Sequence, residues 1–100
     1  MILEVAMLNV VPGREEPFEA NFGEAQNIIV SMHGYVSHQL QRCLEDTSRY
    51  VLLVNWQTLE DHTVGFRESD EYYQWRNLLH EFYDPFPEVL RFESVYQSPE

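Results

Sequence analysis

Two segments of this sequence are apolar at most positions, and this constrains the fold more than any other feature. They are residues 2–11, ILEVAMLNVV, and residues 49–57, RYVLLVNWQ. Side chains alternate between the two faces of a β-strand, so a strand with one face in water alternates between apolar and polar residues. These two segments therefore predict strands that are covered on both faces.

The sequence between and after these segments predicts two helical regions and two further strands. Residues 14–32 place apolar side chains at intervals of three and four, which is typical of one helix face. Residues 35–44, YVSHQLQRCL, alternate and predict a half-polar strand at an edge of the sheet. Thr58 is expected to cap a short helix that ends near Gly65.

The last part of the chain completes a known order of elements. Ser69 is expected to cap another helix, which the segment DPFP at residues 84–87 stops. Residues 88–96, EVLRFESVY, predict the last strand. The order β-α-β-β-α-β in a single domain of residues 1–100 predicts an α+β, ferredoxin-like fold. Such a fold is a four-stranded antiparallel sheet with its helices on one face.

Helices on one face leave the other face of the sheet bare. Because both long apolar strands are apolar on both faces, either residues such as Leu3, Val5 and Met7 or their neighbours on the opposite face would lie in water. An exposed apolar patch of that size usually marks an interface. We therefore expect a homodimer that packs sheet against sheet with twofold symmetry.

The net charge limits the classes of partner. Seventeen Asp and Glu side chains face six Arg and no Lys, so the formal net charge is −11. Such a charge repels nucleic acid and anionic membranes, and no apolar run is long enough to span a bilayer. The N-terminus lacks a basic leader and Cys43 is the single cysteine, which together predict a cytoplasmic protein.

Residues 62–86, HTVGFRESDEYYQWRNLLHEFYDPF, hold seven of the fourteen aromatic residues. The same segment contains two of the four His and two of the six Arg. A packed core would explain the aromatic rings but not the polar groups. A pocket for a flat apolar molecule would explain the rings and the polar groups together, and we expect this segment to form the wall and lid of such a pocket.

Two residues of this segment are candidates for catalysis. His62 can act as the base that takes a proton from a phenol or hydroquinone; the alternative is an exposed or hydrogen-bonded surface histidine. Arg67 can stabilise a phenolate or a superoxide-like charge, because a guanidinium stays protonated. The alternative for Arg67, which its sequence neighbours favour, is an ion pair with a nearby acid: Glu68, Asp70 or Glu71.

Six further residues are candidates for contact with the substrate: Phe66, Tyr72, Trp75, Arg76, His80 and Tyr83. Tyr72 and Trp75 are three apart on one helix face, so they can equally be core residues. For Arg76 the favoured alternative is an ion pair with Glu71 or Glu81. No pair of histidines has metal-binding spacing on a helix, and no glycine-rich phosphate loop is present, so we expect neither a metal nor a dinucleotide.

Several landmarks, in order and at the right spacing, give the chain a resemblance to a known family. They are Pro12-Gly13, Phe18, the motif Met32-x-Gly34-Tyr35, Trp56 and Ser69. Over nearly the whole chain the sequence resembles the antibiotic biosynthesis monooxygenase (ABM) superfamily. The resemblance implies a dimeric ferredoxin-like fold with a pocket between sheet and helices. It also implies chemistry on phenolic, quinone or haem substrates in those members that are enzymes.

Three residues argue against a place in the haem-degrading branch of that superfamily. Its members carry an Asn, a Trp and a His where this sequence has Ala6, Phe66 and Arg76, so the axial ligand of a haem is missing. The resemblance therefore favours a cofactor-independent monooxygenase or oxidoreductase that acts on a small aromatic molecule. The alternative is a dimeric protein of the same fold that binds a small molecule, or serves in stress, without catalysis.

Overall fold

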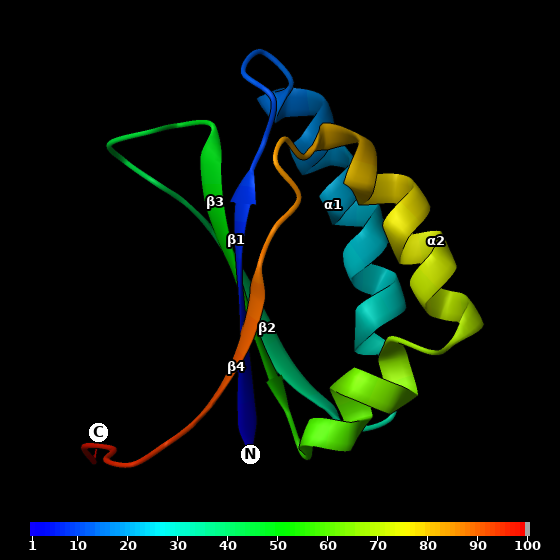
Figure 1. The fold of residues 1–100 in the computed structure, drawn as a ribbon, viewed down its shortest axis with the longest axis vertical. Coiled ribbons are helices and arrows are strands. Elements are labelled where there is room, and N and C mark those ends of the chain that lie inside the picture. Colours follow the sequence, from blue (N-terminus) through cyan, green and yellow to red (C-terminus); the bar gives the residue numbers. More distant parts are fainter. Residues whose placement is uncertain (100) are drawn as a thin grey trace.

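The computed structural model describes residues 1–99 and contains one antiparallel sheet with helices on one face (Figure 1). The elements in chain order are β1 (Ile2–Asn9), α1 (Glu15–Val30), β2 (Tyr35–Arg42), β3 (Arg49–Trp56), the π-helical turn η1 (Asp61–Phe66), α2 (Asp70–Leu79), the 3₁₀ turn η2 (His80–Phe82) and β4 (Val89–Glu93). The strands lie side by side in the order β2-β3-β1-β4. The predicted ferredoxin-like fold is therefore confirmed.

The two long apolar strands are the two central strands of the sheet. β1 pairs with β3 along its whole length, from Ile2 opposite Trp56 to Asn9 opposite Arg49. On β3 every second residue is buried beneath the helices, namely Tyr50, Leu52, Val54 and Trp56. β2 pairs only with β3 and forms the predicted half-polar edge.

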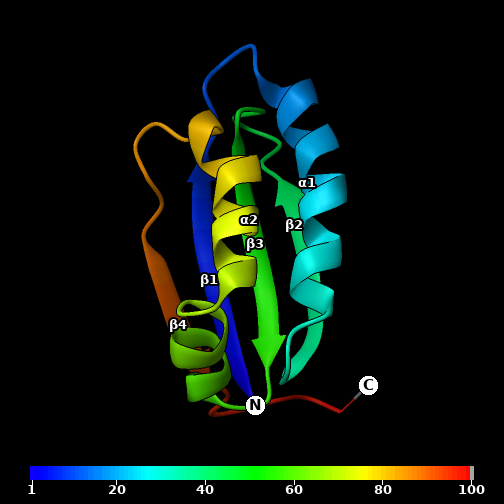
Figure 2. The same ribbon diagram turned by 90° about the vertical axis from the view of Figure 1, so that its right-hand side faces the viewer.

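Both helices cover the same face of the sheet, and they lie beside each other on it (Figure 2). α1 buries the stripe Phe18, Phe22, Ala25 and Ile29, as its spacing predicts. The ring of Phe18 lies 4.9 Å from that of Tyr50 on β3 and 5.9 Å from that of Phe82 on η2. Within residues 1–99, no helix combines the length and the apolar content that crossing a bilayer requires.

The predicted caps organise the segment between β3 and α2. The Thr58 hydroxyl donates to Asp61 Oδ2 at 2.9 Å, and the Asp61 backbone N–H donates back to the hydroxyl at 3.2 Å. The following turn does not end at Gly65: the Arg67 N–H donates to the His62 carbonyl, which carries η1 through Phe66. Ser69 Oγ then accepts from the Tyr72 N–H and starts α2.

The last strand is shorter than predicted. β4 ends at Glu93, which pairs with Ile2, so β1 has almost no residues left to pair with the chain beyond it. Residues 94–99 are exposed and extend away from the sheet (Figure 1). Expecting strand as far as residue 96 was therefore wrong. Apolar alternation indicated that these residues can be extended, but it could not supply them with a partner strand.

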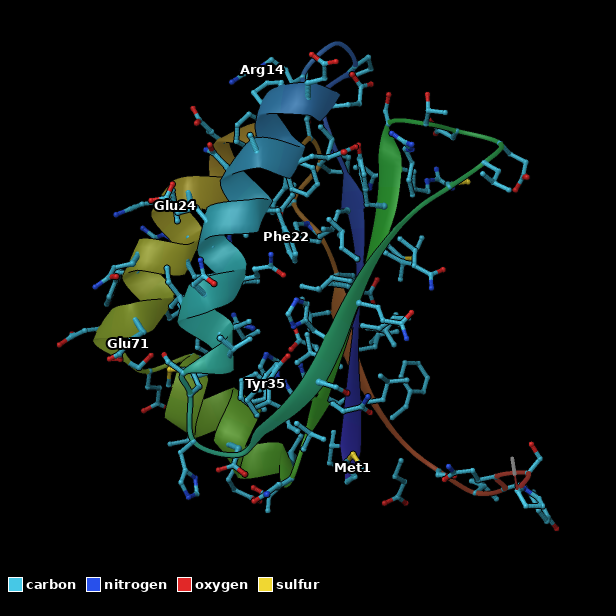
Figure 3. The ribbon with its side chains drawn as sticks, turned by 180° about the vertical axis from the view of Figure 1, so that it is seen from behind. Met1, Arg14, Phe22, Glu24, Tyr35 and Glu71 are labelled. Carbon is cyan, nitrogen blue, oxygen red and sulfur yellow. The ribbon has the colours of Figure 1, made fainter. Side chains whose placement is uncertain are left out.

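The face of the sheet opposite the helices is apolar at its centre and uncovered in the single chain (Figure 3). The strand registers place these side chains on it: Leu3, Val5, Met7, Val51, Leu53, Leu90 and Phe92. Met7, Leu90 and Phe92 are each more than two fifths exposed. The edge strand β2 adds the polar side chains of Gln39 and Gln41 to the same face.

Two glycines provide a test of the turn that places η1. Gly34 follows α1 with φ +83°, and a Cβ there would overlap the Asp61 side chain. We expect Gly34→Ala to lower the free energy of unfolding by at least about 1–2 kcal/mol, through left-handed strain and this clash. Gly23, inside α1, has free space around it. We expect Gly23→Ala to raise the free energy of unfolding by about 0.5–1 kcal/mol, because alanine favours the helix more than glycine does. Urea unfolding measures both; equal effects would contradict this account.

Candidate functional site

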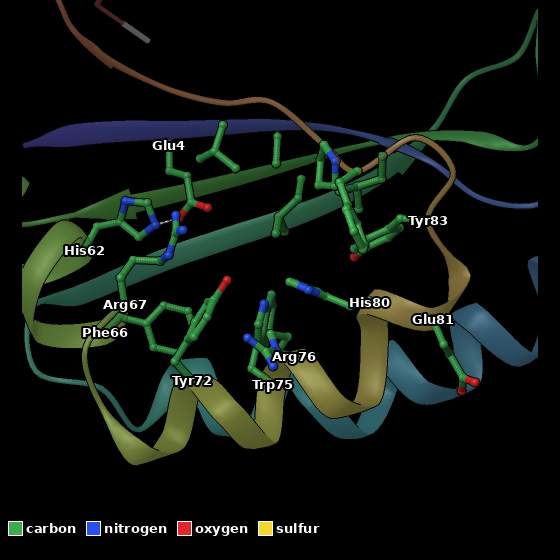
Figure 4. Close-up of a pocket in the computed structure, with 16 residues that line it drawn as sticks. Glu4, His62, Phe66, Arg67, Tyr72, Trp75, Arg76, His80, Glu81 and Tyr83 are labelled. Carbon is green, nitrogen blue, oxygen red and sulfur yellow. Dashed lines mark ion pairs between the residues drawn. The ribbon is translucent and has the colours of Figure 1, made fainter.

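A cavity of about 770 Å³ lies between the sheet and α2. All eight residues predicted for the site line it: His62, Phe66, Arg67, Tyr72, Trp75, Arg76, His80 and Tyr83. Figure 4 places Glu4, His62 and Arg67 at one end and His80 and Tyr83 at the other. The segment 62–86 thus forms one wall of a cavity, while the sheet supplies its floor.

The floor comes from the helix-facing rows of three strands. Glu4, Ala6 and Leu8 of β1 line the cavity together with Leu52 of β3 and Val89 of β4. Ala6 lies between Leu52 and Val89 in the strand registers. Its short side chain leaves room at the middle of the floor, where a larger residue would fill the space.

The aromatic wall is continuous with the core. The ring of Phe66 stacks against Trp56 at 5.8 Å and meets the edges of Tyr72 and Trp75 at 5.3 and 5.7 Å. Phe66 and Trp75 are buried, yet both line the cavity. They are therefore core residues and wall residues at once, and their packing holds the wall in one position.

The cavity floor contains a buried carboxylate. Glu4 is only 6% exposed, and its Oε1 accepts a hydrogen bond of 2.9 Å from Trp56 Nε1. His62 Nε2 lies 3.3 Å from the same oxygen. Burial raises the pKa of Glu4, while the Trp56 hydrogen bond and the positive charges of Arg67 and Arg91 oppose this.

His62 lies inside the protein and not on its surface. Its side chain is 1% exposed and its ring stacks on Trp56 at 5.6 Å. Nδ1 is buried and has no hydrogen-bond partner within residues 1–99. Burial, with the positive charges of Arg67 and Arg91, lowers the pKa of His62 to about 4, so the imidazole is neutral at neutral pH. The predicted alternative of a surface histidine was wrong.

The two arginines of the cavity lie near aromatic rings. Within residues 1–99, neither Arg67 nor Arg76 forms an ion pair, so the favoured alternative for each was wrong. Arg67 instead places its guanidinium 5.1 Å from the ring centre of Tyr72, and Arg76 lies 5.7 Å from that of Tyr73. The charge of Arg67 is therefore free to act on a molecule in the cavity.

The opposite end of the cavity is a cluster of polar-tipped rings. His80 lies 5.8 Å from Tyr83 and 5.7 Å from Phe86, measured between ring centres. Burial lowers the pKa of His80 and raises that of Tyr83 above its ordinary value. Both groups are thus kept neutral. The structure brings them into the same cavity as His62 and Arg67, although roles for them remain a prediction.

Glu4 is a buried titratable residue of the cavity that the sequence analysis did not select. Its signal was available: it is the one charged residue in the run ILEVAMLNVV, and it shares a strand face with Ala6 and Leu8. A carboxylate in a row that packs beneath helices needs a partner or a function. Within residues 1–99, no three metal-ligating side chains gather in one place.

The family of the protein follows from comparison with known proteins. The family model for the antibiotic biosynthesis monooxygenase matches residues 1–78, which is most of the chain. The chain belongs to the antibiotic biosynthesis monooxygenase family. The resemblance carried by the turn after β1, by Trp56 and by Ser69 is thereby confirmed.

Individual relatives agree with this assignment. Protein YczJ of Bacillus subtilis (strain 168) is 53% identical over 95 residues, which cover 95% of this chain and all of YczJ. The crystal structure of a candidate antibiotic biosynthesis monooxygenase from Bordetella bronchiseptica has a TM-score of 0.90 and 36% identity, over 95% of this chain and 97% of that one. SnoaB, a cofactor-independent oxygenase from Streptomyces nogalater, shares the fold with a TM-score of 0.83 at 20% identity, over 99% and 97% of the two chains.

The buried state of His62 predicts a specific pH dependence of stability. Between pH 6.5 and pH 4, unfolded His62 takes up a proton that folded His62 with its pKa of about 4 does not, so acidification destabilises the fold. We expect wild type to lose up to about 3 kcal/mol more than His62→Gln across this window. Glu4 is present in both proteins, so its opposite contribution largely cancels. Denaturant unfolding at several pH values measures the difference; parallel pH curves would contradict the buried state.

Proposed function

We propose that this protein is a cofactor-independent monooxygenase that oxidises a small aromatic substrate, such as a phenol, a hydroquinone or a polyketide-like ring. The observation that carries the proposal is one cavity with an aromatic wall, a buried acid–base pair and a guanidinium that forms no ion pair within residues 1–99. Membership of the family supports it. The fold is also that of SnoaB, a cofactor-independent oxygenase.

The reaction requires a base, a positive charge and an aromatic slot that excludes water. Removal of a proton from an anthrone-type methylene, the keto form of a phenol, leaves an electron-rich enolate that can reduce oxygen directly. Overall, the CH₂ group and O₂ give a C=O group and H₂O: two C–H bonds break, and the carbon loses the four electrons that O₂ gains. The protein must accept the first proton, stabilise the resulting negative charge and exclude water.

Each part has a candidate among the cavity residues. We place the base at His62 and its close neighbour Glu4, 3.3 Å apart. Arg67 is the candidate for stabilising the enolate and the reduced oxygen, because its charge has no acidic partner within the described residues. Phe66, Tyr72 and Trp75 form the slot that holds the ring of the substrate.

Oxygen uptake tests the activity and the role of Arg67. We expect the protein to consume oxygen faster than buffer with at least one member of a panel of hydroquinones and anthrone-type phenols. Arg67→Gln should lower kcat/KM by about 10–100-fold, because the charge that forms in the reaction loses its counter-charge. Arg14→Gln is the matched control: that guanidinium lies over Phe82 and outside the cavity, so the rate should be unchanged.

The alternative of a binding protein gives a different result. No turnover above buffer, together with a ligand-dependent rise in Tm for the same aromatic compounds, would replace catalysis with binding in the same cavity. An Arg67→Gln variant as active as wild type would remove Arg67 from the mechanism and leave the cavity assignment in place.

We also propose that the functional unit is a homodimer that packs sheet against sheet. The uncovered face is apolar at its centre, on β1, β3 and β4, and polar at the β2 edge. A single chain leaves this apolar centre in water, whereas a twofold-related copy would cover it with the same surface. The two strands that are apolar on both faces would then have both faces buried.

A charge at the centre of this face tests the dimer. Leu53 lies between Val5 of β1 and Gln39 of β2 on the uncovered face, so Leu53→Glu leaves the core of the chain unchanged. We expect it to weaken association at least about 100-fold, because each copy would bury an unpaired carboxylate. Sedimentation velocity measures this, with Gln74→Glu on the exposed side of α2 as control. A wild-type protein that stays monomeric at high concentration would refute the dimer.

A further inference from the structure

The contacts of the buried pair distinguish the two possible bases. Glu4 Oε1 is occupied by the Trp56 N–H at 2.9 Å and by the approach of His62 Nε2 to 3.3 Å. Glu4 Oε2 has no hydrogen-bond partner within residues 1–99. Among the fully buried side-chain nitrogen and oxygen atoms of those residues, only His62 Nδ1 lacks a partner. Oε2 is therefore not fully buried, and Glu4 lines the cavity.

The same contacts assign the proton on His62. Nε2 lies 3.3 Å from Glu4 Oε1, whereas a proton on Nδ1 would be buried without an acceptor. The Nε2–H tautomer is therefore favoured, because an unpaired buried donor is costly. The one basic position of this imidazole is then the lone pair of Nδ1, which is closed to the cavity.

We infer that Glu4 is the residue that takes the proton of the substrate, through Oε2, and that His62 and Trp56 position it by holding Oε1. The proton leaves a C–H or O–H bond of the substrate, whose electron pair stays behind as an enolate or phenolate. The carboxylate becomes a neutral carboxylic acid. This inference rests on the proposed function, and it names a catalytic residue where a core strand would otherwise carry an apolar one.

The environment of Glu4 suits a base. Burial raises its pKa, and a base whose pKa lies nearer to neutrality takes a proton more readily while it is still ionised. The titratable and charged groups beside it are His62 from η1, Arg67 directly after η1 and Arg91 from β4, while Tyr72 from α2 lines the same cavity. The two arginines limit the rise and favour the ionised form.

Proton abstraction can be measured apart from oxygen chemistry. Under argon in D₂O, an anthrone-type probe exchanges its acidic methylene protons for deuterium, which proton NMR follows as loss of signal. We expect wild type to accelerate this exchange over buffer. Glu4→Gln should lower the acceleration at least about 100-fold, because an amide is not basic. His62→Gln carries the same new amide and should lose no more than about tenfold, because its N–H can still face Oε1.

The matched pair of glutamine variants decides between the two residues. Exchange that depends on Glu4 and survives in His62→Gln supports the inference. Exchange that survives in Glu4→Gln, or a wild type with no acceleration, overturns it. If both variants lose exchange, formate decides: saturable rescue of Glu4→Ala by formate supports Glu4 as the base, and the absence of rescue overturns it. Thermal unfolding verifies that each variant is folded.

The pH profile adds a result that a structural role would not produce. Wild-type exchange should rise with pH through the raised pKa of Glu4, and the residual rate of Glu4→Gln should lack this limb. The failure of this inference is separable from failure of the proposed function. Exchange without oxygen uptake would keep Glu4 as a base and reject the monooxygenase. Oxygen uptake that is unchanged in Glu4→Gln would keep the monooxygenase and reject Glu4.

Discussion

The indole of Trp56 is the contact on which the rest of the site depends. Trp56 is the last residue of β3, is fully buried, and donates its indole N–H to Glu4 Oε1 at 2.9 Å. Its rings stack against His62 at 5.6 Å and Phe66 at 5.8 Å. One side chain therefore joins the central strands to η1, and it compensates part of the cost of burying a carboxylate between them.

The site combines features that a packed core alone does not require. The chain carries a net charge of −11, yet within the described residues the guanidinium of Arg67 lies over Tyr72 and forms no ion pair with an acid. In the described part of the chain, Glu4 Oε2 accepts no hydrogen bond. Both arrangements cost stability in an isolated chain, and both become favourable when a molecule with a removable proton and a developing negative charge enters the cavity.

Much of the fold could be predicted because it depends on local patterns. The apolar runs around Val5 and Leu52 predict central strands, and Ser69 starts α2 where its hydroxyl can accept from Tyr72. The sequence could also indicate which residues line the cavity, because rings and titratable groups are concentrated in 62–86. One error arose because a partner distant in sequence decides: β4 stops where β1 ends. The other arose among sequence neighbours: Arg67 and Arg76 lie over the rings of Tyr72 and Tyr73 and not beside the nearby acids, a choice that residue types alone do not reveal.

The sequence by itself determined the strand and helix periods, the family and the membership of the aromatic wall, because these depend on spacing along one segment. Tertiary structure alone decided which polar group reaches the cavity. Glu4 and His62 are far apart in sequence, and only the pairing of β1 with β3 and the packing of η1 on Trp56 bring them to 3.3 Å. Burial and hydrogen-bond geometry then set the protonation of each, and neither can be read from residue types along a chain.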